Sequence, residues 1–284
     1  MVKIGVIGVG DMGAEIVPHL VSVGNEVAAF DARNERTLRA ESAGARAAAS
    51  PAEAASGADV VLGLVMSSDI PAAYFGPEGL LSGVRPGAVV VVASTTTPAV
   101  LDEIRAKAPS DVQIVDAPIV GGVRYARSRS ITFLVGAIPE VFHTVEAVLS
   151  VLGNVRHVGG FGSGVGYKLV TNVAIMAAEA GIREALDLAD LLGMDYATAL
   201  DLMSIGPMAA VVSRALDTTN PRPLRRSAED DDTLLSAVPD ASSALPISSA
   251  GRKRLWEAVN ANPDFEPDFV DITRRTTAQE GFRD

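Results

Sequence analysis

The sequence predicts an α/β protein, in which a doubly wound, mostly parallel sheet is followed by a long helix and an all-helical second domain. Three observations predict it. Short β-branched runs alternate with helical patterns up to about residue 161, a glycine-rich turn follows the first run, and strand signals stop after Gly164. The chain has 284 residues, whereas an average domain has about 150. We therefore expect two domains, residues 1–161 and 162–284.

Six short apolar runs are expected to form the strands of the first domain, because strands that alternate with helices are typical of βαβ units. The connecting segments carry recognisable helix starts. At one of them Ser50 is a candidate N-cap, Pro51 occupies the first helical position and Glu53 is an early acid. The six runs are Ile4–Ile7, Val27–Phe30, Val60–Val65, Ala88–Ala93, Gln113–Asp116 and Ile131–Val135.

The first run leads directly into the glycine-rich turn Gly8-Val9-Gly10-Asp11-Met12-Gly13. In a G-x-G-x-x-G turn the first glycine permits the tight turn, the second lets the backbone approach a pyrophosphate, and the third allows close packing of the next helix. That helix, over residues 14–23, would offer free N–H groups to the phosphates. We therefore expect a Rossmann-type domain in which all six residues contact a dinucleotide, rather than glycines that serve close packing only.

Asp31 ends the next strand, about 20 residues after the turn. A carboxylate at this place accepts hydrogen bonds from the adenosine ribose hydroxyls and repels a 2′-phosphate. We expect a preference for NAD on this ground. Arg33, two residues later, could instead support NADP.

The second half of the chain is expected to be helical. Apolar residues dominate from Val165 to about Leu192, and a helix of that length would span about 40 Å, enough to join two domains. The acidic run Glu229–Asp232 is expected to be the solvated start of a helix. The last residues, about 20 in number, should be poorly ordered unless they dock on a partner. Further helical patterns occur at Asp195–Met203, Met208–Leu216, Asp231–Val238 and Ser248–Ala261.

Composition excludes several classes of function. A net charge of −11 argues against nucleic-acid binding, which needs clustered Lys and Arg. The chain has no cysteine, so thiolate metal sites are impossible, and His19, His143 and His157 lack ligand spacing, so we expect no metal. No apolar run approaches about 18 residues, and the N-terminus lacks a basic, cleavable segment. We therefore expect no membrane association and a cytoplasmic protein.

Lys168 is unusual for its position on the long helix, because apolar residues follow it and Asn172 lies four residues later, on the same helix face. A lysine in an apolar, partly desolvated setting can have a lowered pKa and shuttle a proton near neutral pH. The alternative is a lysine that extends its ammonium group into water. Its position at a helix start beside a nucleotide domain favours the proton shuttle.

From Lys3 to about Met203 the chain resembles the β-hydroxyacid dehydrogenases, typified by 3-hydroxyisobutyrate dehydrogenase and tartronate semialdehyde reductase, with 6-phosphogluconate dehydrogenase as a larger relative. Four motifs in the family's order carry the resemblance. They are Gly8–Gly13, the pair Ser94-Thr95, the segment Asp116–Gly122, and Lys168 with Asn172.

The resemblance implies hydride transfer between a nicotinamide cofactor and a small β-hydroxy acid, or its semialdehyde or keto form. It implies that Lys168 is the general acid and base, that Asn172 holds the substrate, and that Gly121 and Gly122 offer N–H groups to the substrate's carboxylate. The expected cofactor contacts extend to Val65, Met66 and Thr95. Helical second domains in this family dimerise or tetramerise, which implies a homodimer or homotetramer.

Departures from the family pattern concern the substrate. Val120 stands where the family has a serine, Arg124 and Arg129 stand at positions that are commonly glycine, and Tyr125 stands where a small residue is usual. Arg124 could clamp a carboxylate or phosphate, or it could be a surface arginine on a loop. We expect a best substrate other than 3-hydroxyisobutyrate.

A second departure lies where the family has the motif K-D-L-x-L-A. The best alignment places Asp230-Asp231-Asp232-Thr233-Leu234 there, so the lysine is missing. Two alternative functions follow from these departures: an imine or ketone reductase on the same scaffold, and a non-catalytic nucleotide-binding protein. Lys168 argues against the first, because imine reductases that resemble this family generally replace that lysine. Lys168 and Asn172 together argue against the second.

Overall fold

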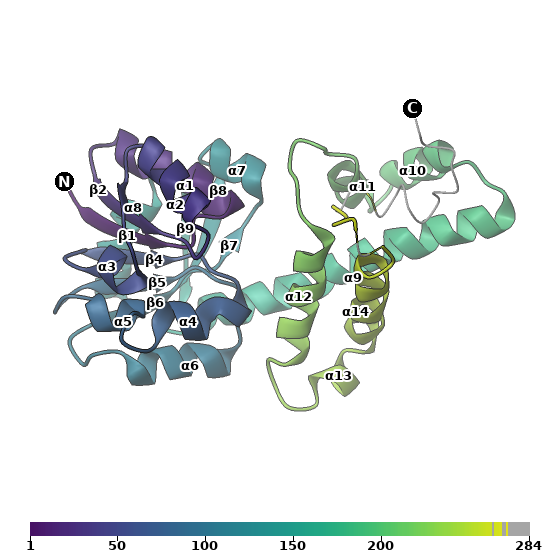
Figure 1. The fold of residues 1–284 in the computed structure, drawn as a ribbon. Helices are drawn as coiled ribbons and strands as arrows, with labels where there is room; N and C mark the ends of the chain where they lie inside the picture. Colours follow the sequence, from purple (N-terminus) through teal and green to yellow (C-terminus); the bar gives the residue numbers. More distant parts are fainter. Residues whose placement is uncertain (263, 269–270, 272–284) are drawn as a thin grey trace. The chain divides into compact units, whose positions relative to one another are not determined.

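Residues 1–262, 264–268 and 271 are described by the structure, which is a computed structural model. The chain divides into two compact units, Met1–Leu169 and Val170–Asp284, and each is considered by itself (Figure 1). The division falls in the second turn of helix α9 (Ser163–Leu192), whereas the boundary expected from the sequence, between residues 161 and 162, lies just before that helix.

The first unit is built on a sheet that has nine strands within the described residues. Its order is β3-β2-β1-β4-β5-β6-β8-β7, with β9 paired to β8. The six strands from β3 to β6 are parallel, whereas β8 runs antiparallel to both β6 and β7. The strands are β1 (Lys3–Ile7), β2 (Glu26–Phe30), β3 (Arg46–Ala47), β4 (Val60–Gly63), β5 (Val89–Val92), β6 (Gln113–Asp116), β7 (Ile119–Val120), β8 (Ile131–Gly136) and β9 (Gly153–Gly159).

This sheet confirms the predicted α/β class and the doubly wound parallel arrangement. The six apolar runs correspond to β1, β2, β4, β5, β6 and β8. The sequence did not reveal β3 and β7, which have two residues each, or β9, which is largely polar and only partly buried. Such strands carry neither an apolar run nor an alternating pattern, so periodicity does not detect them.

Helices lie on both sides of the sheet, with α1 and α2 on one side and α4, α5 and α6 on the other (Figure 1). Both faces are therefore covered, which is why β5 is four consecutive buried valines rather than an alternating strand. At α3 the predicted start is confirmed, since Glu53 N donates to Ser50 Oγ at 3.1 Å. The helices are α1 (Asp11–Ser22), α2 (Asn34–Ser42), α3 (Pro51–Ala55), the 3₁₀ turn η1 (Ser67–Asp69), α4 (Ile70–Tyr74), α5 (Leu80–Gly83), α6 (Pro98–Lys107), α7 (Val123–Arg127) and α8 (Pro139–Leu149).

The described part of the second unit is helical, apart from an isolated bridge between Pro223 and Asp268. The long helix α9 has 30 residues and confirms the predicted connecting helix. The expectation for the last residues of the chain falls largely outside the described residues. After α9 follow α10 (Tyr196–Ser204), α11 (Ala209–Ala215), α12 (Leu224–Leu235), α13 (Ala241–Ala244) and α14 (Pro246–Val259), in which α12 packs on α14.

The acidic run is not the solvated start of a helix, so that prediction is wrong. Helix α12 begins at Leu224, and the four acids lie in its middle. Asp231 is fully buried, and Asp230 Oδ2 lies 2.9 Å from Arg222 Nη2. The buried face of α12 has helical spacing and passes through the acidic run at Asp231, with the members Leu224, Ser227, Ala228, Asp231 and Leu234.

The carboxyl group of Asp231 is buried where its charged form is unfavourable. Neither of its oxygens has a hydrogen-bond partner among the described residues. Burial, together with the nearby charges of Glu179, Asp230 and Asp232, raises the pKa of Asp231 to about 7, against the opposing charge of Arg252. The folded helical unit therefore favours a protonated Asp231.

We expect the free energy of unfolding to fall as pH rises from about 4 towards about 7, because the folded state holds a proton that the unfolded state has released. Asp231→Asn should flatten this slope, whereas Asp201→Asn, at an exposed position of α10, should leave it unchanged. Urea unfolding at several pH values, followed by the fluorescence of Trp256, the single tryptophan of the chain, measures the slope. An equal slope in wild type and Asp231→Asn would contradict this account.

Candidate active site

The strand order reverses between β1 and β4. From β1 the chain moves outward to β2 and β3, and it then returns to β4 on the other side of β1. In open α/β sheets, ligands bind outside the carboxyl ends of the strands at such a reversal. Gly8 directly follows β1 there, and Leu64 and Val65 follow β4.

The segment Gly8–Gly13, called the glycine loop below, has the geometry that its sequence predicts. Gly8 has φ +94°, and a Cβ on it would lie 2.9 Å from the carbonyl carbon of Leu64. A Cβ on Gly10 would lie 3.3 Å from Arg36 Nη1. Helix α1 begins directly after Gly10, and the N–H groups of a first helical turn have no partner inside the helix. The loop therefore leaves backbone room where a pyrophosphate would lie, at the start of a helix whose first N–H groups are not used by the helix itself.

Asp31 connects the end of β2 to the glycine loop. Val9 N donates to Asp31 Oδ2 at 2.9 Å, and Arg33 N donates to Asp31 Oδ1 at 2.9 Å. Arg36 Nη1 lies 3.7 Å from the same Oδ2. The carboxylate is thus held beside the loop, where it has further lone pairs for ribose hydroxyls. These features fit an adenosine dinucleotide.

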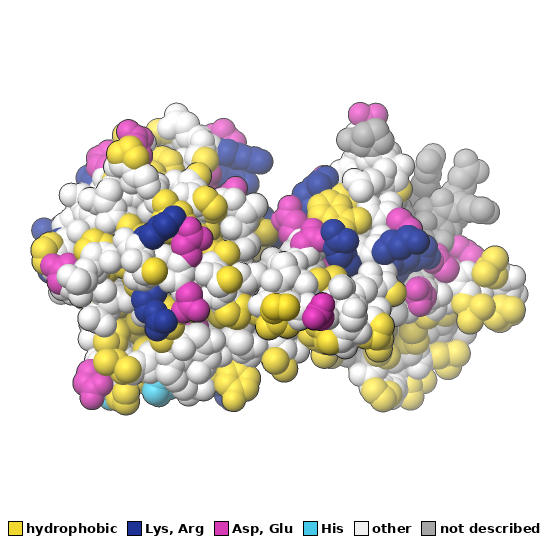
Figure 2. Space-filling view, turned by 90° about the horizontal axis from the view of Figure 1, so that it is seen from below, with side chains coloured by type: hydrophobic (Ala, Val, Ile, Leu, Met, Phe, Trp, Pro, Cys, Tyr) yellow, Lys and Arg dark blue, Asp and Glu magenta, His cyan; other side chains and the backbone are white. Residues whose placement is uncertain are grey.

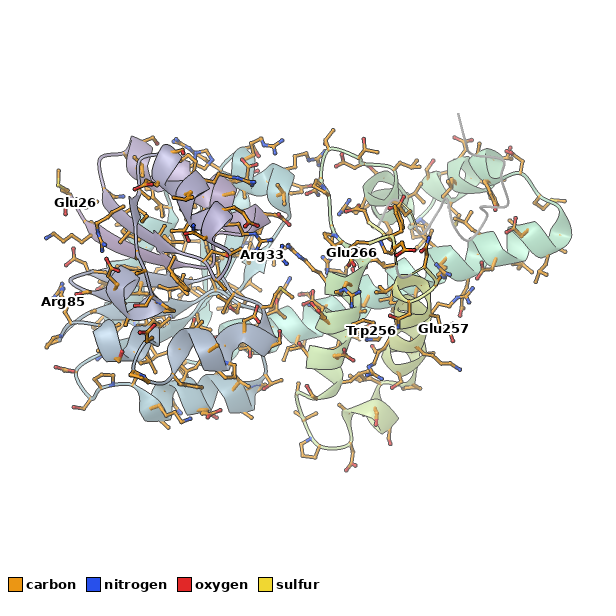
Figure 3. All side chains as sticks on the ribbon, viewed as in Figure 1. Glu26, Arg33, Arg85, Trp256, Glu257 and Glu266 are labelled. Carbon is orange, nitrogen blue, oxygen red and sulfur yellow. The ribbon has the colours of Figure 1, made fainter. Side chains whose placement is uncertain are left out.

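Arg36 is a residue that sequence reasoning missed. Arg33, the arginine that it named, has an exposed side chain and is labelled in Figure 3. Arg36 lies in the first turn of α2 and reaches both Asp31 and the glycine loop. Recognising a helix that starts at Asn34 would have revealed this, since its first turn returns to the carboxyl end of β2.

The predicted cofactor contacts after β4 and β5 lie together. Ser94 Oγ donates to the carbonyl oxygen of Val65 at 2.6 Å, and Val65 Cγ1 would lie 3.1 Å from a Cβ on Gly8. Met66 follows Val65 as the N-cap residue of η1. Thr95 is half-buried, whereas Ser94 before it and Thr96 after it are buried. Thr95 is therefore the partly exposed residue of this segment after β5.

The segment Val120–Gly122, called the β7–α7 turn below, exposes its backbone. Gly121 has φ +119°, and Gly122 is the N-cap residue of α7. Arg124 is exposed, and its guanidinium carbon lies 5.0 Å from the centre of the Tyr125 ring. Arg124 Nη2 also donates to Tyr125 Oη at 3.1 Å. The two added side chains thus pack on each other beside the turn.

Asp116, at the end of β6, is fully buried and is bonded to the start of α9. Gly162 N donates to Asp116 Oδ1 and Val165 N donates to Oδ2, both at 2.8 Å. Burial raises the pKa of Asp116, and these backbone hydrogen bonds act against the rise. Sequence reasoning had Asp116 in a motif without assigning it a role. The feature of the sequence that could have revealed its role is its place, as an acid at the carboxyl end of a parallel strand.

Lys168 and Asn172 lie one turn apart on α9 and are both buried, with 9% and 1% of their surface exposed. Lys168 therefore does not extend into water as a surface lysine would. Asn172 Nδ2 is buried and has no hydrogen-bond partner among the described residues. A buried amide donor without a partner costs free energy, and a bound polar ligand would offset that cost.

The histidines have structural or surface contacts. His157 Nε2 lies 2.7 Å from the carbonyl oxygen of Ala137, His143 is exposed beside Glu146, and His19 lies against α7. Among the described residues no cluster of His, Asp and Glu could hold a metal ion.

The visible surface shows no continuous basic patch on its described residues, because Lys and Arg side chains are interspersed with acidic and hydrophobic ones (Figure 2). None of the described helices is long and apolar enough to cross a membrane.

The chain is similar to known dehydrogenases. Residues 3–160 match the family described as the NAD binding domain of 6-phosphogluconate dehydrogenase. A probable 3-hydroxyisobutyrate dehydrogenase-like protein of Arabidopsis thaliana is 31% identical over 96% of this chain and 94% of its own length. The 2-(hydroxymethyl)glutarate dehydrogenase of Eubacterium barkeri is 32% identical over 71% of this chain and 68% of its own. The solved 3-hydroxyisobutyrate dehydrogenase of Mycobacterium tuberculosis with L-serine has a TM-score of 0.81 at 23% identity, covering 98% and 100% of the two chains.

Proposed function

Since this chain belongs to the β-hydroxyacid dehydrogenase family, whose members are nicotinamide-dependent oxidoreductases, we propose that it oxidises a small β-hydroxy acid, or reduces the matching semialdehyde or keto acid, with Lys168 as the general acid and base. The observation that carries the proposal is a buried lysine one helical turn from a buried asparagine amide without a partner. Both lie on a helix whose start is bonded to Asp116.

A nicotinamide cofactor, which the glycine loop and Asp31 would hold, would supply the acceptor for the hydride of the hydroxyl-bearing carbon. Lys168 Nζ takes the hydroxyl proton in oxidation and returns it to the carbonyl oxygen in reduction. Asn172 Nδ2 donates to a substrate oxygen, and the N–H groups of Gly121 and Gly122 face the carboxylate. Burial of Lys168 and Asn172 keeps water from competing for the proton.

The experiment that tests this function is the initial rate with NAD and NADP across a panel of β-hydroxy acids. The matching semialdehydes and cyclic imines should be tried with the reduced cofactors. Turnover of a hydroxy acid supports the proposal. Turnover of imines alone would favour an imine reductase, and cofactor binding without any turnover would favour a non-catalytic nucleotide-binding protein.

The substrate is proposed to differ from 3-hydroxyisobutyrate. Val120 supplies no hydroxyl at the β7–α7 turn, whereas Arg124 and Tyr125 add a guanidinium and a phenol beside it. Arg124 is exposed and carries a charge that a second carboxylate or a phosphate of the substrate could pair with.

Val120→Ser should raise kcat/KM for simple 3-hydroxy acids by about fivefold, because a new neutral hydrogen bond contributes about 1 kcal/mol. Kinetics across the same panel measure the gain, and Val120→Ala is the control that removes bulk without adding a hydroxyl. If the serine variant gains nothing over the alanine variant, then Arg124, Tyr125 or the helical unit governs selectivity instead.

NAD is proposed as the preferred cofactor, because the Asp31 carboxylate lies where a 2′-phosphate would be repelled. Asp31→Asn should shift the ratio of kcat/KM for NADP to that for NAD upward by about 10- to 100-fold, since a hydrogen bond to a charged group contributes about 1.5–3 kcal/mol. In this background Arg36→Gln should remove part of the gain, because Arg36 then pairs with the phosphate. A ratio that stays constant in Asp31→Asn would show that Asp31 does not select the cofactor.

The helical unit is proposed to form a homodimer or homotetramer. Exposed hydrophobic side chains are numerous on it, including Leu191 and Ile205, and yellow side chains gather at the right-hand end of Figure 2, which is the helical unit. Patches of this kind mark interfaces between proteins. A cytoplasmic location stays a prediction, and several named relatives are mitochondrial.

A further inference from the structure

Helix α7 is too short to hold its own position. It has five residues, starts directly after Gly122, and buries only Val123 and Ala126. A helix of this length has no stability in isolation. Its orientation therefore depends on the elements that contact it, of which α1 is one.

His19 of α1 bonds the end of α7. Its Nε2 lies 3.1 Å from the carbonyl oxygen of Ala126 and 3.0 Å from that of Arg127. The Arg127 carbonyl belongs to the last residue of the helix, and the Ala126 carbonyl also accepts from Arg129 N at 3.2 Å. On the other side of the ring, Arg129 Nε donates to His19 Nδ1 at 3.0 Å. An arginine only donates, so Nδ1 is the acceptor, and the hydrogen bonds assign a neutral imidazole with its proton on Nε2.

Arg129 occupies a backbone conformation that favours glycine, with φ +54°. Its side chain is bonded at both ends of the guanidinium. Besides the bond to His19, Nη2 donates to Ser22 Oγ at 3.0 Å, and this hydroxyl donates to the carbonyl oxygen of His19 at 2.8 Å. The strained conformation is thus offset by hydrogen bonds that a glycine at this position could not form.

Three polar residues of α1 take part, and their spacing places them on one helix face. His19 and Ser22 bind as described, and Glu15 Oε1 accepts a hydrogen bond from Arg127 Nη2 at 2.7 Å. The same helix begins at the glycine loop. We call the contacts of His19 and Ser22 with Ala126, Arg127 and Arg129 the α1–α7 clasp.

Tyr125 couples the position of α7 to the β7–α7 turn. A Cβ on Gly121 would lie 3.2 Å from Tyr125 Cβ, so the aromatic residue packs directly on this glycine. Ser130 N donates to the carbonyl oxygen of Tyr125 at 2.8 Å, which closes the end of α7 beside Arg129. A shift of α7 would therefore move the backbone of Gly121.

We propose that His19 and Arg129 are positioning residues. The α1–α7 clasp fixes the position of the β7–α7 turn relative to the glycine loop. In this way it sets the affinity for the substrate, although neither residue touches the substrate. This inference rests on the proposed function, because that function assigns the substrate carboxylate to Gly121 and Gly122.

The test compares three single variants and one double variant of the full chain. His19→Leu removes the donor and the acceptor. Arg129→Gly removes the guanidinium while relieving the backbone conformation, so it should fold well. His19→Gln keeps one donor and one acceptor on neighbouring atoms, so it should keep the KM of the wild type. We expect His19→Leu and Arg129→Gly each to raise the KM for the hydroxy acid roughly tenfold, with the Kd for NAD within about twofold of wild type. The double variant should be no worse than the single ones, because both remove the same link.

Hydrogen exchange of the backbone amides gives a readout that needs no turnover. In His19→Leu and Arg129→Gly, amides of residues 121–127 should exchange faster, while those of the glycine loop should not change. Unchanged exchange at residues 121–127 in both variants would overturn the proposal, whether or not a substrate is found. Faster exchange with an unchanged KM would also overturn it, since the turn would then be more mobile without any effect on the affinity for the substrate. A wild type that oxidises no hydroxy acid contradicts the proposed function, and exchange still decides whether the clasp holds the turn.

Discussion

Lys168→Ala is expected to lower kcat about 10³-fold or more while changing the Kd for NAD by less than about twofold. General acid and base catalysis contributes about 10²- to 10⁴-fold, and Lys168 is the buried amine on the helix face that carries Asn172. Cofactor affinity should be unchanged, because the glycine loop and Asp31 follow the ends of β1 and β2, whereas Lys168 lies on α9. Steady-state rates and titration of the reduced cofactor's fluorescence measure the two quantities.

Two further observations distinguish a proton shuttle from a structural lysine. Lys168→Arg keeps the positive charge but cannot give up its proton near neutral pH, so it should be nearly as inactive as the alanine variant. A small primary amine added to Lys168→Ala should restore part of the rate. Parallel losses of turnover and cofactor affinity, together with no rescue, would overturn the assignment.

Asp116→Asn is expected to lower both stability and kcat. The buried carboxylate accepts from two backbone N–H groups at the start of α9, whereas an amide accepts at one end and turns an NH₂ group towards the second donor. Hydrogen bonds to a charged group contribute about 1.5–3 kcal/mol, so a loss of about 2 kcal/mol in the free energy of unfolding is expected. Because Lys168 follows on the same helix, misplacement should also cost roughly 10²-fold in kcat.

Urea unfolding and steady-state kinetics of Asp116→Asn test these two effects. Glu103→Gln is a suitable control, since it removes an exposed carboxylate that pairs with Lys107 on α6. A variant that loses stability but keeps kcat would show that Asp116 only supports the fold. A variant that keeps both would contradict the role given to its hydrogen bonds.

Local chemistry explains which parts of the molecule the sequence could predict. The glycine loop and Asp31 were predictable because each residue has one physical task at one place in a βαβ unit. Their geometry then matched, with Gly8 at φ +94° and Val9 bonded to Asp31. The long helix was predictable because its apolar character continues without a turn signal.

Features that depend on contacts between distant segments could not be read in the same way. Asp231 looked solvated among four acids, but the face of α12 that packs inward passes through it. The contact of Arg36 with Asp31 depends on where α2 begins, and His19 meets Arg129 from 110 positions away in the sequence. No local pattern contains these pairings.

Hydride transfer itself is the central claim, and isotope transfer tests it most directly. A β-hydroxy acid that carries deuterium on its hydroxyl-bearing carbon is incubated with the enzyme and NAD, and the reduced cofactor is analysed by mass spectrometry. The account predicts one deuterium on the nicotinamide with the wild type and none above background with Lys168→Ala. Reduced cofactor without the label, or equal labelling in both proteins, would contradict it.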